Sequence, residues 1–146
     1  MPPTPSAESG SPATGTNRAA ARRGVATAEL AVCLPVVVLL VVATIEACSM
    51  VFVKQSLSVA AYEGVRTAIS ANATASDVAN MCNQILTDRR VDGASVIISP
   101  RNFTTLNPGD YVDVTVSAPC SQNTVVPNRF YRGRTLSATA SMMIEL

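Results

Sequence analysis

The sequence predicts an α+β protein in which a long N-terminal membrane helix continues out of the bilayer and is followed by a short helix and a small antiparallel sheet of about three strands. Three observations indicate this. The run 30–45 is apolar without a single charge, helical spacing of apolar residues continues beyond it to about residue 70, and the C-terminal third alternates between apolar and polar residues.

The first twenty-four residues predict a disordered basic leader that is cleaved. Residues 1–17 are mostly Pro, Ser, Thr, Gly and Ala, a composition that buries too little apolar surface to offset the entropy of ordering. Arg18, Arg22 and Arg23 then form a basic flank. Residues 25–53 are interpreted as the transmembrane helix. Because 146 residues suffice for one domain only, residues 54–146 are interpreted as one α+β domain.

The charge pattern predicts the orientation of this helix. Three arginines precede the apolar run, whereas Lys54 follows it and is opposed by Glu46. Positive charge is retained on the cytoplasmic side of a membrane, so the N-terminus is expected inside the cell and the C-terminal domain outside. The expected location is a single-pass protein of the bacterial inner (cytoplasmic) membrane.

Beyond the membrane the helix is expected to reach about Ser70, with Val53, Leu57, Ala61 and Val65 on one face. A second helix is predicted from about Ser76, its N-cap, to Arg89. Strands are predicted at 95–99, 111–117 and 136–144, and the Asn107-Pro-Gly-Asp110 sequence indicates a turn before the second of them.

Composition argues against an enzyme. The chain has no histidine, which removes the commonest general base and metal ligand, and its four cysteines have no paired metal-binding spacing. We therefore expect no catalytic residues, no metal, no cofactor and no small-molecule substrate. Net charge is only +1, so no nucleic-acid partner is expected either.

Cys82 and Cys120 both fall in the segment placed outside the cell, where a disulfide is chemically permitted. The alternative is two buried free thiols. Cys33 and Cys48 are interpreted as small apolar residues of the membrane helix.

A processing motif precedes the apolar run. Arg22 and Arg23 lead to Gly24, then Val25 follows, and Glu29 stands at the fifth position after the glycine. This arrangement resembles the cleavage site of prepilin-like substrates. A glycine leaves a scissile backbone sterically open. A carboxylate at the start of an apolar helix is costly once it enters the hydrocarbon, so Glu29 either has a function or lies in the headgroup region, where it favours the helix N-terminus.

Residues 20–70 resemble the TadE-like family, minor pseudopilins of tight-adherence (Flp-type) pilus systems. The resemblance rests on Gly24-x4-Glu29, Leu34-Pro35, Ile45-Glu46 and the run Ala-Ala-Tyr-Glu-Gly-Val-Arg at 60–66. It implies cleavage of the Gly24–Val25 bond by a prepilin peptidase and a role for Glu29 in processing or assembly. It also implies other pilins or pseudopilins and a pilus assembly platform as partners, in cell adhesion or secretion.

Leu30 stands where Flp major pilins usually carry an aromatic residue, and the chain is much longer than they are, so a minor component is favoured over the main fibre subunit. Two alternatives stay open. One is a membrane-anchored binding module of the cell envelope that is never processed. The other is an exported soluble protein released by cleavage near Ala43.

Overall fold

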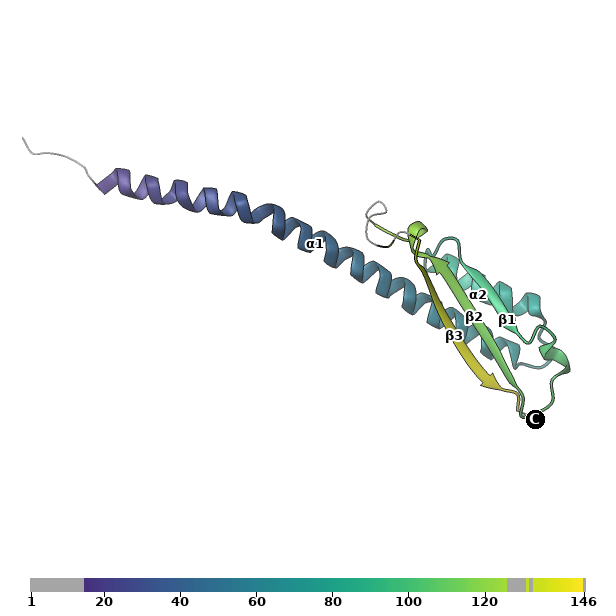
Figure 1. The fold of residues 1–146 in the computed structure, drawn as a ribbon. Coiled ribbons are helices and arrows are strands. Elements are labelled where there is room, and N and C mark those ends of the chain that lie inside the picture. The colour runs from purple at the N-terminus through teal and green to yellow at the C-terminus, as the bar shows by residue number, and fades with distance from the viewer. Residues whose placement is uncertain (1–14, 126–130, 132, 146) are drawn as a thin grey trace, which may run out of the picture. The chain divides into compact units, whose positions relative to one another are not determined.

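The computed structural model describes residues 15–125, 131 and 133–145, with side chains described from Gly24 onward. The chain divides into two compact units, Met1–Val41 and Val42–Leu146, and each is considered by itself. The described elements are helix α1 (Gly15–Ala68), helix α2 (Ala75–Asp88), strand β1 (Ser95–Ser99), the short 3-10 helix η1 (Phe103–Thr105), strand β2 (Tyr111–Pro119), the 3-10 helix η2 (Cys120–Gln122) and strand β3 (Thr135–Met143) (Figure 1). The α+β prediction is confirmed.

In the first unit, α1 begins at Gly15, ten residues before the predicted start at Val25. Alanine and arginine are strong helix formers, and residues 18–23 contain nothing else. This explains why the backbone is already helical in the second half of the predicted leader. The first fourteen residues of that leader, where disorder was predicted, lie outside the described part of the chain.

Every side chain from Gly24 to Val41 is exposed, and nearly all of them are apolar. In the second unit the pattern changes at Glu46, which is only 2% exposed, and Met50 and Val53 follow it into the interior. The folded domain therefore begins to cover α1 about eight residues before the boundary predicted at residue 54. Glu46, which the sequence placed near the boundary of the membrane segment, therefore lies inside the folded domain.

The rest of α1 follows the predicted helical spacing. Its buried face consists of Val53, Leu57, Ala60, Ala61, Val65 and Ala68. Glu63 and Arg66 form an ion pair one turn apart on the exposed side, at 3.8 Å. Such exposed pairs contribute little to stability, so the helix is held chiefly by burial of its apolar face.

The sheet is an antiparallel meander in the order β1-β2-β3. On the central strand β2, Val112, Val114 and Val116 are fully buried, as their alternation predicted. These valines share one core cluster with residues of α1 and α2, so both helices cover the same face of the sheet (Figure 1). The other face is mainly polar, with hydroxyl pairs such as Thr115–Thr139 at 2.8 Å, and it also carries exposed Ile97, Tyr111 and Met143.

The Asn107–Asp110 turn before β2 forms as predicted. The Asp110 amide donates to the Asn107 carbonyl at 3.1 Å, and the Asn107 amide donates to an Asp110 carboxylate oxygen at 3.0 Å. Gly109 has a φ of 98°, a backbone conformation that residues with a side chain rarely adopt.

The N-cap of α2 is Thr74, and the prediction of Ser76 was wrong. Thr74 and Asp77 form a capping box, in which the Asp77 amide donates to the Thr74 hydroxyl at 3.3 Å and the Thr74 amide donates to the Asp77 carboxylate at 2.9 Å. The Thr74 hydroxyl also donates to that carboxylate, at 2.6 Å. Ser76 has a capping side chain too, but only Thr74 lies three residues before an acid that can complete the box.

These hydrogen bonds predict that the stability of the folded protein decreases at acidic pH. The hydrogen bonds from the Thr74 hydroxyl and then from its amide hold the pKa of Asp77 below its ordinary value. Because the folded pKa is depressed, the stabilisation is present above the unfolded pKa of about 3.9 and is lost as the pH falls through the folded pKa. We expect the Asp77→Asn variant to lose less thermal stability than the wild type between pH 5 and pH 2, measured as the fall in melting temperature.

The control is Asp88→Asn, which removes an equal charge at the opposite end of the same helix. Asp88→Asn leaves the capping box intact, so it should not reduce the loss of stability in acid as Asp77→Asn does. Identical profiles for the wild type and Asp77→Asn would contradict the assignment.

Candidate processing site and groove

Gly24 lies in α1 with open space around it. A β-carbon built there meets no atom within 4 Å, so nothing in the described chain requires a glycine at this position. Gly64, in the same helix, is the opposite case, because a β-carbon there would lie 2.5 Å from Cys82 Sγ. Within the described part of the chain Gly24 therefore has no packing role, and a requirement for glycine there is expected to come from a partner that approaches the backbone.

Val25 and Glu29 stand one helical turn apart, a separation that places both side chains on one face of α1. Both are exposed. The three predicted site residues thus lie together at the start of the apolar stretch and are exposed on the surface of the helix. The Gly24–Val25 bond itself lies within regular helix, where the backbone amides and carbonyls are occupied by helical hydrogen bonds.

The other predicted pair, Cys82 and Cys120, is not joined by a bond, and both side chains are buried free thiols. Cys82 donates to the Ala60 carbonyl at 3.3 Å and so belongs to the contact between α2 and α1. Cys120 begins η2 at the end of β2. Burial raises the pKa of the Cys82 thiol, which lowers the fraction present as reactive thiolate at neutral pH.

Alkylation can therefore distinguish free thiols from a disulfide. In denaturant and without reductant, we expect the full chain to take up four maleimide groups by mass spectrometry. In the folded protein, Cys82 and Cys120 should react far more slowly than in denaturant, and the reaction of Cys82 should accelerate as the pH rises. Uptake of only two groups in denaturant, rising to four after reduction, would show a bridge.

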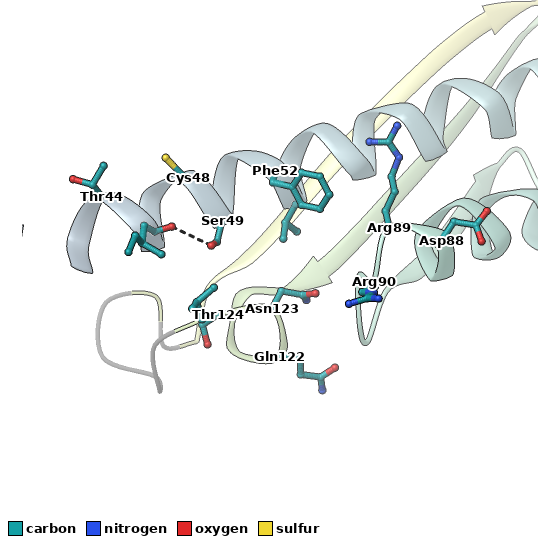
Figure 2. A pocket seen from close by; sticks show the side chains of 13 residues that line it. Thr44, Cys48, Ser49, Phe52, Asp88, Arg89, Arg90, Gln122, Asn123 and Thr124 are labelled. Atoms are coloured by element: carbon teal, nitrogen blue, oxygen red, sulfur yellow. Dashed lines mark hydrogen bonds between the residues drawn. The ribbon is translucent and has the colours of Figure 1, made fainter. Parts of the chain in front are cut away.

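A groove of about 1060 Å³ opens in the second unit, between α1, the end of α2 and the segment after β2 (Figure 2). Its α1 side is largely apolar and includes Ile45 and Phe52, which are about half exposed. The opposite side carries Arg89 and Arg90, and Val125 adds a further exposed apolar side chain.

Asn123 holds the polar side of the groove in place. Its Oδ1 accepts from the Asp92 amide, and its Nδ2 donates to the carbonyls of Asp92 and Pro119, all at 2.9 Å. The turn after α2 is thereby fastened to the end of β2. Nothing in the local sequence indicated this, because the two segments are about thirty residues apart.

Among the residues described, no cluster of three or more His, Cys, Asp or Glu side chains has the arrangement of a metal site. Of the described helices, the stretch Gly24–Ala68 of α1 is the one with the length and apolar composition of a membrane-crossing helix.

Residues 24–66 match the family of TadE-like proteins. The predicted resemblance is confirmed over this segment. The TadE-like segment contains the processing motif, the exposed apolar part of α1 and most of its buried face. The α2 helix and the sheet lie outside the match. No curated protein and no solved structure matches the chain significantly.

Proposed function

We propose that the chain is a minor pseudopilin-like subunit that acts in assembly of a Flp-type (Tad) pilus or secretion apparatus. A prepilin peptidase cuts it between Gly24 and Val25 on the cytoplasmic side of the inner membrane. The mature protein keeps its apolar helix in the membrane and presents the domain outside. The observation that carries this proposal is the TadE-like match, which begins at the glycine of the processing motif and runs through the exposed apolar helix.

The burial pattern supports a membrane segment shorter than the one predicted from the sequence. Residues 25–45 lie before the first buried side chain, Glu46. At about 1.5 Å per residue they reach on the order of 30 Å, the thickness of the hydrocarbon core. On this interpretation the carboxylate of Glu46 lies within the folded domain at the outer boundary, where a charge is tolerated better than at the centre of the bilayer.

The exposed apolar helix provides the assembly surface. Helices in lipid associate by close packing of small side chains rather than by the hydrophobic effect. Ala26, Ala28 and Ala31 occupy the first turns after Gly24 and are all exposed. Other pilins or pseudopilins would pack there, while the domain contacts the assembly platform.

A second candidate function is a membrane-anchored binding module that keeps its leader. The observation that favours it is the unbroken helix from Gly15 through the Gly24–Val25 bond, because a peptidase has to unwind a helix to reach its backbone.

The N-terminus of the protein extracted from membranes of its native host tests the two candidates. We expect N-terminal mass spectrometry to find a chain that starts at Val25. A start at or near Met1 would contradict processing and favour the anchored module. A water-soluble chain that starts beyond residue 43 would contradict both.

A further inference from the structure

The groove of the second unit combines apolar surface with positive charge, which together complement the acyl chains and the phosphate of a phospholipid. Ile45, Phe52 and Val125 supply exposed apolar area, and the Arg89 and Arg90 guanidinium groups supply positive charge. Asp88 is the one acid among the lining residues, and Figure 2 shows its carboxylate directed away from the α1 side chains. The local charge of the groove is therefore positive.

Neither arginine is neutralised within the described part of the chain. Among the described residues, no ion pair joins a carboxylate to Arg89 or Arg90. A planar guanidinium binds a phosphate through two parallel hydrogen bonds, and it does so best where it is not already engaged by a carboxylate.

The backbone at Arg90 places its side chain at the end of α2. Arg90 directly follows the C-cap of α2 with a φ of 54°, the left-handed conformation for which glycine is the usual residue. This conformation closes the helix end, because the Arg90 amide donates to the Thr87 carbonyl at 3.0 Å and the Val91 amide donates to the Leu86 carbonyl at 2.9 Å. The Asn123 hydrogen bonds hold the turn that presents the Arg90 side chain.

The position of the groove along the chain points to the kind of ligand. Its α1 side begins at Thr44, directly after the fully exposed apolar stretch 24–41. This step rests on the proposed function, in which that stretch lies in the membrane. Thr44 to Phe52 then lie at the level of the outer headgroups.

We propose that the groove binds one anionic phospholipid of the phosphatidylglycerol class, with its phosphate on Arg89 and Arg90. The first methylene groups of an acyl chain lie against Ile45, Phe52 and Val125. The bound lipid would fix the height of the domain above the membrane. It would thereby set how deep α1 lies in the membrane when the subunit assembles.

The test uses the full chain purified from membranes in a neutral detergent, with native mass spectrometry and lipid titration as readouts. We expect dioctanoyl phosphatidylglycerol to bind at least about tenfold more tightly than dioctanoyl phosphatidylcholine. Arg89→Gln/Arg90→Gln should reduce its affinity to that of the neutral lipid. Inorganic phosphate at millimolar concentration should neither bind nor compete.

The matched control is Arg66→Gln/Arg101→Gln, which removes the same two charges from residues that do not line the groove. It should leave the affinity for phosphatidylglycerol unchanged. An equal loss in the control would show general electrostatic attraction and overturn the proposal, as would equal affinity for the two lipids. Competition by inorganic phosphate would reassign the groove to a free anion.

Failure here is distinct from failure of the proposed function. A protein that starts at Val25 and stays in the membrane but does not prefer the anionic lipid would refute the lipid site alone. A protein that leaves the membrane would refute the function on which the site rests.

Discussion

Gly64→Ala is expected to destabilise the folded domain by about 1–3 kcal/mol, although alanine is the better helix former. The added carbon would lie 2.5 Å from Cys82 Sγ and 3.1 Å from a Val114 methyl group. Both neighbours are fully buried in the centre of the core, so neither can move away without displacing others. Gly64→Val should destabilise the domain further. The measurement is the denaturant midpoint for alkylation of Cys120, a buried thiol well away from the substitution in sequence.

Cys82→Ala offers a rescue, because it removes the sulfur atom that the new carbon would meet. The double variant Gly64→Ala/Cys82→Ala should be more stable than the sum of the two single changes predicts. Gly24→Ala is the control in the same helix, where nothing lies within 4 Å, and it should leave the midpoint unchanged. Additive effects in the double variant would contradict the close approach of α1 to α2.

Gly24→Phe is expected to abolish maturation, so that the unprocessed chain accumulates in the membrane at its full length. An aromatic side chain at this position would block a partner's approach to the backbone, which the described chain leaves open at Gly24. Because Gly24 has no packing contact, folding should be unaffected. The readout is the gel mobility and N-terminal mass of the protein in a host that contains the peptidase.

Two further variants make this result specific. Cys33→Phe places the same aromatic side chain at an exposed position of the same helix outside the motif, and it should mature normally. Glu29→Gln separates processing from assembly, since a chain that starts at Val25 but fails to join the apparatus would assign Glu29 to assembly. Normal maturation of Gly24→Phe would remove the processing motif from the proposal.

Much of the fold follows from local sequence because its signals are periodic. Val112, Val114 and Val116 alternate with polar residues and form the buried face of β2. Leu57, Ala61 and Val65 recur at helical spacing and form the buried face of α1. In each case a regular element contacts the core on one side only, so the spacing of its apolar residues indicates the buried face.

The processing motif is local in the same sense. Gly24, Val25 and Glu29 lie within six residues of one helix, and their spacing and the basic flank are visible without a fold. The structure adds that they are exposed and that Gly24 has no packing role.

The tertiary structure decided the features that depend on distant segments. Glu46 belongs to an apolar run, and only the domain folded around it makes it a buried residue rather than a membrane one. Nothing in the helical sequence distinguishes Gly64. The need for a glycine there arises because Cys82 and Val114, on two other elements, lie too close to admit a β-carbon. Arg89 and Arg90 have the sequence of a solvated turn, and they become one side of a groove because Asn123 fastens that turn to β2. The sequence alone thus determined which face of each element is apolar and where the proposed processing motif would lie. Which residues meet across elements was decided by packing, because such contacts join positions that have no regular spacing along the chain.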